Sequence, residues 1–543
     1  MKKTPCVLIL LFCLLSDSVI SQTWFRTYGG NINTETNKLF EHYDKGYVLS
    51  GERYGNGSTC YGWVLKTDIN GYERWSKSYG YTNKMVILYG AKPTNDGGII
   101  EIGVSNKLNS NCTNPLVIKL NACGEKEWCK LYNAQNCNSG GYDIVPISDG
   151  GYMALIDHWT NNQQKLIWLF RLDSLGGVIW SQTYATDTIF VDECSHSLLM
   201  TSDSNFVITA ETYYPDSSLP PNNYILKILL IKVNINGIAQ FTEPWGTNNG
   251  VISDGRVSII DAENNIYTAG RRQRTVSPGG DSPCLFYTNP TGQSIYYNDL
   301  KSNSLLGEAT TVNWLQDSTL VICAGWKDQS GNDTTGLIKT TQTGNFIKQK
   351  ALMFNQDNIL RGSGITYNFR ILIGGSVFNP TSVNWQSYLF KLTSNLEYDS
   401  TYTRPFTYDS LCPHPIVSDT IPLNDCQVVI VGLDDAEKNP EKAKLHIYPN
   451  PAVGEVIIEM PQYLVRKNQG SGITATTTYF QWNQTRIDML DLTGKLLYSQ
   501  DIPKQQTQVK LDVSAWPAGM YLARIVFMNE VVAEAKFIKQ GKK

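Results

Sequence analysis

Residues capable of catalysis stand far apart in this 543-residue sequence. The five histidines are all single, and no His-Glu-x-x-His, Gly-x-Ser-x-Gly, Walker or Gly-x-Gly-x-x-Gly stretch occurs. Ser195 and His196, near Asp192 and Glu193, have the residue types of a nucleophile, a base and an acidic partner. A single histidine in a strand beside a loop is usually structural. We therefore predict no catalytic residue and favour a protein that is not an enzyme.

Basic residues recur at one position of a repeated strand and form the first candidate binding site. This basic column consists of Lys66, Lys119, Arg171, Lys232, Lys339 and Lys391, with Tyr287 in the remaining repeat. Arranged in a circle, these side chains would offer positive charge to an anionic ligand. Alternatively, each long stem packs between repeats while its charged end pairs with an acidic neighbour. We favour this structural interpretation.

Two other stretches have the composition of binding sites. Arg271–Arg274 is a dense basic patch, and Asp328–Asp333 is acidic but lacks the full ligand spacing of a calcium loop. We interpret both as polar loops. No Cys-x-x-Cys occurs, and no group of cysteine and histidine has zinc-binding spacing. We predict neither a metal site nor a cofactor.

Seven copies of a short apolar strand organise the chain around these residues. Successive copies begin 52, 53, 54, 60, 54 and 51 residues apart. They are Tyr47–Gly51, Ile99–Gly103, Tyr152–Ile156, Phe206–Ala210, Ile266–Gly270, Leu320–Ala324 and Ile371–Gly375. A second strand follows each copy and usually ends in a short polar residue with Gly three positions later, as in Asp68 and Gly71. Such residues favour tight turns, so the pattern predicts a hairpin in every repeat.

Each repeat holds about four strands. An aromatic residue such as Trp75 usually opens a third strand, and a further strand, such as Lys38–Tyr43, precedes each copy. Units of this size with four strands are typical of β-propellers, where radial packing buries both faces of each sheet. We predict an all-β seven-bladed β-propeller; a β-solenoid or a sandwich is the alternative. Either Trp24–Tyr28 or Leu396–Tyr402 would complete the last blade.

The composition changes from Asp434, after the end of the repeats. The charged stretch Asp434–Lys444 precedes short strands separated by Asp-Leu-Thr-Gly and Pro-Ala-Gly turns, a pattern that predicts a small Ig-like β-sandwich. We therefore predict a propeller over residues 22–410, a linker containing Cys and Pro over 411–444, and a β-sandwich over 445–543.

Four motifs of the last 100 residues occur in a characteristic order. They are Ile447–Glu459, Ile487–Tyr498, Leu511–Ile525 and Lys536–Gln540. Together they resemble the type A C-terminal sorting domain of proteins exported by the type IX secretion system of Bacteroidota. A polar insertion over Gln462–Gln484 and three residues after Gln540 depart from that pattern. The residues that match the sorting motifs are Tyr448, Pro449, Asn450, Pro451, Gly494, Pro517, Gly519, Tyr521, Lys536 and Lys539.

This resemblance implies a route of export and a set of partners. It implies passage through the periplasm, recognition by the outer-membrane translocon, and removal by a sortase-like protease. The cargo is then released or attached to the cell surface.

The N-terminus independently predicts export. Met1–Lys3 is basic and Val7–Leu15 is apolar, so we predict a signal peptide over residues 1–21. That apolar run is too short to span a bilayer, and no longer one follows, so we expect no transmembrane segment.

Export permits disulfides, and ten cysteines follow the predicted signal peptide. Cys123 and Cys129 flank a turn and could bridge that hairpin, while Cys412 and Cys426 could close a Pro-rich stretch. Cys112 with Cys137 is a third candidate pair, and unpaired buried thiols are the alternative. Cys323 lies in an apolar run and is predicted to be a small core residue.

These observations favour an exported binding or adhesion protein whose propeller loops contact a glycan or a protein. The net charge of −3 and the pI near 6.0 disfavour nucleic acid as a partner. A propeller-fold glycan lyase, a hydrolase or another extracellular enzyme is the alternative, and a structural component of the cell envelope is the third possibility.

Overall fold

The computed structural model describes most of the propeller region and the strands of the C-terminal domain. The described residues are 24–55, 59–109, 112–133, 138–159, 165–184, 192–215, 224–245, 253–274, 280–300, 307–327, 333–352, 357–431, 446–459, 485–491, 495–502, 508–527 and 530–541. The predicted signal peptide, Cys137, Asp328 and Gly494 lie outside them. Within these ranges the regular structure is entirely β. The same residues include no helix long and apolar enough to cross a membrane.

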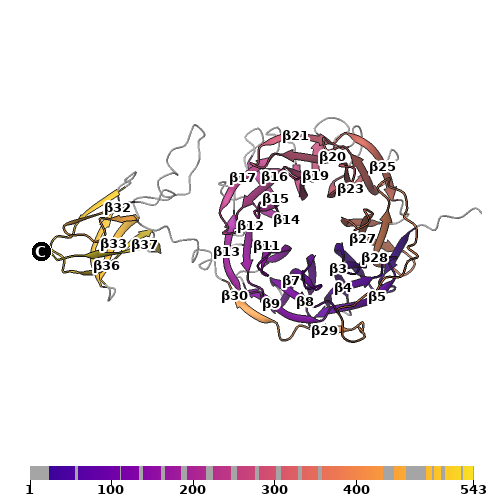
Figure 1. Ribbon diagram of the computed structural model, residues 1–543, viewed down its shortest axis with the longest axis horizontal. Coiled ribbons are helices and arrows are strands. Elements are labelled where there is room, and N and C mark those ends of the chain that lie inside the picture. The colour runs from indigo at the N-terminus through magenta and orange to yellow at the C-terminus, as the bar shows by residue number, and fades with distance from the viewer. Residues whose placement is uncertain are drawn as a thin grey trace, which may run out of the picture.

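Seven antiparallel sheets stand in a ring around a central channel, so the predicted seven-bladed propeller is confirmed (Figure 1). Blades 1 to 3 comprise β2 (Thr34–Glu41), β3 (Tyr47–Tyr54), β4 (Cys60–Thr67) and β5 (Glu73–Gly80); β6 (Val86–Pro93), β7 (Ile99–Asn109), β8 (Cys112–Leu120) and β9 (Lys126–Asn133); and β10 (Gly140–Pro146), β11 (Tyr152–Trp159), β12 (Lys165–Leu172) and β13 (Val178–Tyr184).

Blades 4 to 7 repeat this order from the channel outward. They comprise β14 (Glu193–Met200), β15 (Phe206–Pro215), β16 (Tyr224–Val233) and β17 (Ala239–Trp245); β18 (Ser253–Ile260), β19 (Ile266–Arg274), β20 (Gly280–Thr288) and β21 (Ser294–Asp299); β22 (Ala309–Trp314), β23 (Leu320–Lys327), β24 (Asp333–Thr340) and β25 (Phe346–Leu352); and β26 (Asn358–Ile365), β27 (Ile371–Asn379), β28 (Asn384–Leu392) and β1 (Phe25–Tyr28).

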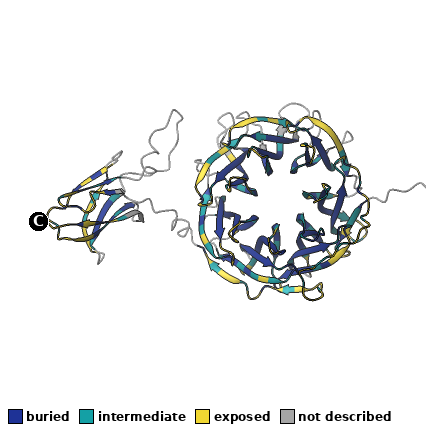
Figure 2. Cartoon of the chain, viewed as in Figure 1, coloured by how far each residue is buried: buried dark blue, intermediate teal, exposed yellow. Residues whose placement is uncertain are grey.

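The repeated apolar strands lie second and third in each blade and are buried on both faces. Figure 2 shows the buried residues inside the ring and most exposed residues on its rim. The hairpin turns form as predicted: Asp68 Oδ1 accepts hydrogen bonds from the amides of Asn70 and Tyr72, both at 2.8 Å. Gly71 supplies the positive φ of 75° that this turn requires.

The N-terminal strand closes the ring. β1 pairs with β28, so the first strand of the propeller is the outermost strand of blade 7. The rings of Phe25 and Phe390 pack with centroids 4.6 Å apart. The alternative segment, Leu396–Tyr402, contributes only an isolated bridge between Tyr398 and Leu392.

The stretch predicted as the start of a linker instead packs against the propeller. We call residues 399–431 the strap. Its β29 (Thr420–Pro422) pairs in parallel with β5, and its β30 (Gln427–Ile430) pairs in parallel with β9, on the outer edges of blades 1 and 2. The linker interpretation is therefore wrong for residues 411–431. Two short strands in this stretch pair with the propeller, and the composition alone does not indicate that pairing.

The strap also corrects the predicted disulfides. All four cysteines are bonded, but Cys123 pairs with Cys412 and Cys129 pairs with Cys426. The hairpin bridge fails because Cys129 lies opposite Ile118 in the sheet whereas Cys123 lies in the turn. Each bridge therefore fixes the strap to blade 2. Cys112 is disulfide-bonded as well, and Cys323 is a free, buried thiol as predicted.

The C-terminal domain has two sheets that share one apolar core, which confirms the predicted β-sandwich. One sheet holds β31 (His446–Tyr448), β32 (Glu455–Glu459) and β35 (Gln508–Asp512). The other holds β33 (Thr485–Asp491), β34 (Leu496–Asp501), β36 (Gly519–Phe527) and β37 (Glu530–Lys539).

Candidate functional site

Every innermost strand of the propeller has one extra residue at the same place. The pairing register shifts there in all seven blades, leaving one residue without a partner on the second strand. A bulge of this kind re-aims a side chain and is common beside functional sites. The seven residues, which we call the bulge ring, are Asn37, Tyr89, Tyr142, His196, Arg256, Thr310 and Arg361.

The bulge ring contains neighbouring aromatic side chains. Tyr89 and Tyr142, from blades 2 and 3, stack with ring centroids 5.3 Å apart and planes inclined by only 7°. Lys165 Nζ lies 5.6 Å from the centre of the Tyr142 ring. Both tyrosines are only half-buried, so the pair offers a flat aromatic surface with a cation beside it.

The next two blades contribute a charged network to the same ring. His196 Nε2 lies 3.2 Å from Glu211, and Arg256 lies 3.2 Å from both Asp254 and Glu308. Burial raises the pKa of Asp254, with Arg256 opposing that effect. Burial also tends to raise the pKa of Glu211. The hydrogen bond and the charge of His196, together with the charge of Arg256, outweigh burial and hold that pKa below its usual value.

The possible catalytic pairing of Ser195 with His196 does not form. Ser195 is buried and its hydroxyl donates to Asp157 of the preceding blade, whereas His196 contacts Glu211. Asp157 also forms an ion pair with Lys165, at 2.6 Å. Burial raises the pKa of Asp157, against the opposing charge of Lys165.

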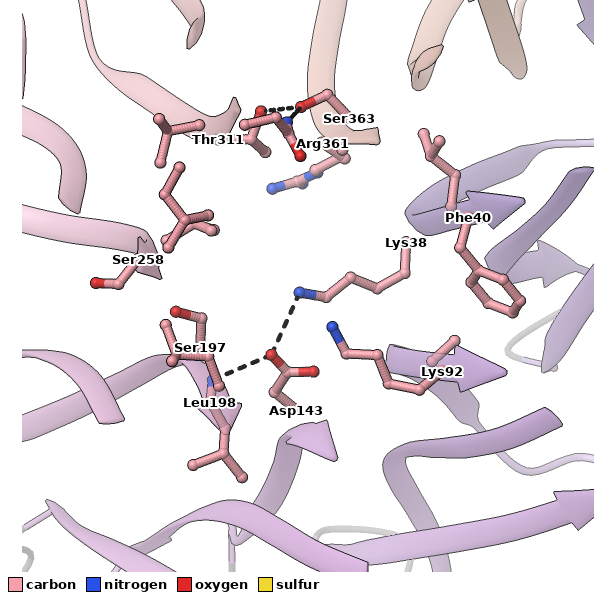
Figure 3. Close-up of a pocket in the computed structure, with 18 of the residues that line it drawn as sticks. Lys38, Phe40, Lys92, Asp143, Ser197, Leu198, Ser258, Thr311, Arg361 and Ser363 are labelled. Atoms are coloured by element: carbon pink, nitrogen blue, oxygen red, sulfur yellow. Dashed lines mark hydrogen bonds and ion pairs between the residues drawn. The ribbon is translucent and has the colours of Figure 1, made fainter. Parts of the chain in front are cut away.

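Next to the bulge ring, and sharing Arg361 with it, the innermost strands line a channel with a volume of about 440 Å³. This is within the size range of small-molecule sites, roughly 300–1,000 Å³. Its charged lining consists of Lys38, Lys92, Asp143 and Arg361, and the closest ion pair joins Lys38 to Asp143 at 3.8 Å (Figure 3). Serine, threonine and asparagine side chains complete the polar part of the wall.

The basic column is structural, as predicted. Each of its six cations is buried and pairs with an aspartate. The aspartate belongs to the same blade as the cation, except for the partner of Lys391, which belongs to the strap. The partners are Asp44 of Lys66, Asp96 of Lys119, Asp149 of Arg171, Asp203 of Lys232, Asp317 of Lys339 and Asp399 of Lys391. In blade 5, Tyr287 packs against two other tyrosines instead.

The other predicted candidates are dispersed. Arg271 pairs with Asp254 at 2.7 Å and Arg272 with Asp299 at 3.2 Å, so both belong to ion pairs of blade 5. Among the described residues, no group of three or more His, Cys, Asp or Glu side chains could hold a metal ion.

The sorting motifs meet beside the last strand. Asn450 accepts a hydrogen bond from the amide of Ile538 at 2.9 Å, and its own amide group contacts Lys536 O at 3.4 Å. Tyr521 donates to Pro517 O at 2.7 Å and stacks on Phe537. Motifs about 90 residues apart in sequence therefore lie on one small surface around β37.

Sequence reasoning missed the bulge ring. Each of its residues stands ten positions before the first residue of a repeated apolar strand, as Tyr89 does before Ile99. Aligning that position would have shown five residue types among the seven blades, in an otherwise more uniform repeat.

Comparison with known families identifies the tail. Residues 446–540 match the family described as "Secretion system C-terminal sorting domain", so the resemblance to a type IX sorting domain is confirmed. No curated protein matches the chain.

Several solved structures are similar to this chain at low sequence identity. The β-propeller domain of the Trilobed protease from Pyrococcus furiosus is 12% identical, covers 70% of this chain and 99% of its own, and has a TM-score of 0.38. An ulvan lyase is 8% identical, covers 69% of this chain and 96% of its own, and has a TM-score of 0.47. A protein of unknown function from Bacteroides caccae is 11% identical, covers 56% of this chain and 93% of its own, and has a TM-score of 0.35. At these identities the likeness concerns the fold alone.

Proposed function

We propose that this protein, a propeller that carries a type IX sorting domain, is an exported binding protein that holds a glycan at its bulge ring. The sorting domain implies secretion or attachment at the outer-membrane surface, and a partnership with the secretion machinery. The predicted signal peptide, the translocon and the sortase-like protease would complete this route.

One observation carries the binding proposal: the scaffold residues repeat from blade to blade, whereas the bulge ring differs in every blade except the two tyrosines and the two arginines. Repetition in the turns and the basic column is explained by folding. A ring that combines stacked aromatic rings, cations and one amide side chain around a channel has the mixture that ligand pockets use for contact area and orientation.

Glycan-array binding followed by calorimetry tests this function. Substituting Tyr89→Ala with Tyr142→Ala is expected to weaken ligand binding at least about tenfold, equivalent to roughly 1.4 kcal/mol, because the stacked surface is lost. Tyr297→Ala removes a half-exposed tyrosine from the outermost strand β21 and should leave affinity unchanged. Absence of any glycan ligand, or equal affinity of all three proteins, would contradict the proposal.

The network of His196, Glu211 and Arg256 supports a second candidate, a glycan lyase or hydrolase. An imidazole beside a carboxylate and a guanidinium can move a proton and stabilise a developing negative charge. Incubation with neutral and acidic polysaccharides, followed by detection of new reducing ends, distinguishes the two. Turnover that is lost in His196→Ala would favour the enzyme, and neither turnover nor binding would favour a structural role in the envelope.

A further inference from the structure

Two of the three cations that line the channel have no carboxylate partner among the described residues, and the third has a distant one. Among the described residues, neither Lys92 nor Arg361 forms an ion pair, although Arg361 acts on Glu52 at longer range. Lys38 has Asp143 at 3.8 Å, a longer separation than in any pair of the basic column. The lining thus holds three cations and one carboxylate, an excess of two positive charges.

Asp143 is already engaged by other groups. Its Oδ2 accepts a hydrogen bond from the amide of Leu198 at 3.1 Å, and its Oδ1 accepts one from the amide of Ile144 at 3.0 Å. Asp143 is only 2% exposed, so it cannot turn outward to follow a second cation. Asp143 therefore holds Lys38 in place, and the positive charges of Lys92 and Arg361 remain without an ion-pair partner among the described residues of the lining.

A buried hydroxyl lines the same space without a partner. Ser197 is 5% exposed, and its Oγ has no hydrogen-bond partner in the part of the chain that the structure describes. A buried polar group without a partner is costly, and such groups often mark the place of a bound ligand. Figure 3 shows Lys38, Lys92 and Asp143 extending toward one another across the channel, with Ser197 and Arg361 on the surrounding wall.

We propose that the propeller channel binds an oxyanion, either a free sulfate or phosphate or the carboxylate of an acidic sugar, between Lys38, Lys92 and Arg361. The site is distinct from the stacked tyrosines, and its cations come from three consecutive blades, 7, 1 and 2, of the closed ring. Charge-assisted hydrogen bonds from ammonium and guanidinium groups are the strongest that these side chains make. Burial lowers the pKa of Lys38; Asp143 opposes this shift and Lys92 adds to it. A bound anion would favour the charged form of Lys38 and so oppose the shift.

Titration calorimetry of the full chain tests the site with three probes: sodium sulfate, sodium phosphate and sodium glucuronate. Chloride keeps the ionic strength constant, because screening alone changes exposed electrostatics. The variants are Lys92→Gln and Arg361→Gln. The matched control is Lys348→Gln, on the outer strand β25, which removes the same charge from a half-exposed position.

We expect saturable binding of at least one probe, weakened at least tenfold by each channel variant, abolished by the double variant and unchanged in Lys348→Gln. Binding of sulfate or phosphate alone identifies a free inorganic ion, and binding of glucuronate alone identifies an acidic sugar. Circular dichroism checks that each variant folds. Because Arg361 is exposed, we expect Arg361→Gln to fold, so it still tests the site if Lys92→Gln does not fold. No binding of any probe by the natural protein, or equal binding by the double variant, would overturn the proposal.

Discussion

Two sets of basic side chains occur in this propeller, and they differ in pairing. In the basic column, six buried cations each have an aspartate partner, and the contact recurs from blade to blade. In the channel, Lys92 and Arg361 have no such partner among the described residues. No other blade has a lysine at the position of Lys92, and only blade 5, with Arg256, has an arginine at the position of Arg361. Repeated, neutralised charge supports the scaffold. Charge without a carboxylate partner needs another explanation, and the proposed oxyanion would supply it.

Breaking a pair of the basic column should have the largest effect. Lys66 and Asp44 are 2.7 Å apart, and their side chains are 0% and 1% exposed. Asp44→Ala leaves a buried ammonium group without its principal partner, so we expect a loss of about 3–5 kcal/mol in the free energy of unfolding. Urea denaturation followed by tryptophan fluorescence measures it. The double variant Lys66→Met with Asp44→Leu should recover most of the loss; a single variant as stable as the natural protein would refute this account.

Glu101 is a buried acid that has no cation partner in the part of the chain that the structure describes. It is 0% exposed, accepts a hydrogen bond from Ser50 at 2.6 Å, and burial raises its pKa to about 8. A folded-state pKa above the unfolded value of about 4.5 gives stability that is complete below pH 4.5 and is lost as the pH rises through 8.

Glu101→Gln removes that titration. Relative to the natural protein, its free energy of unfolding should therefore gain about 2.5 kcal/mol between pH 5 and pH 7. Denaturation curves of both proteins at pH 5 and pH 7 measure this change. A pH-independent loss of stability caused by the amide itself would cancel between the two pH values. A difference that does not change with pH would show that Glu101 is ionised in the folded protein.

The smallest effect is expected in the channel. Lys92→Met should change the free energy of unfolding by less than about 1 kcal/mol, because no partner is left unpaired and a repulsion with Lys38 is removed. The same substitution at Lys66 should cost several kcal/mol. If both lysines proved equally important for stability, the distinction between scaffold charge and ligand charge would be lost.

Much of the scaffold could be predicted because its signals are local and repeated. Asp68 and Gly71 define a turn with neighbours within four residues, and the same spacing recurs along the chain. The basic column was also interpreted correctly, since a buried long side chain needs an acidic partner wherever it occurs. By contrast, the partner of Cys123 is 289 residues away, and no local pattern distinguishes Cys412 from Cys129 as its partner.

The sequence alone determined the number of blades, the hairpins within them and the sorting domain, because periodicity and motifs express contacts between residues close in the chain. Tertiary structure decided which strand closes the ring, where the strap lies and which disulfides form. It also decided that Lys38, Lys92 and Arg361 share one channel. Those outcomes depend on ring closure, which brings the two ends of a propeller of about 400 residues together and places side chains from different blades around one axis.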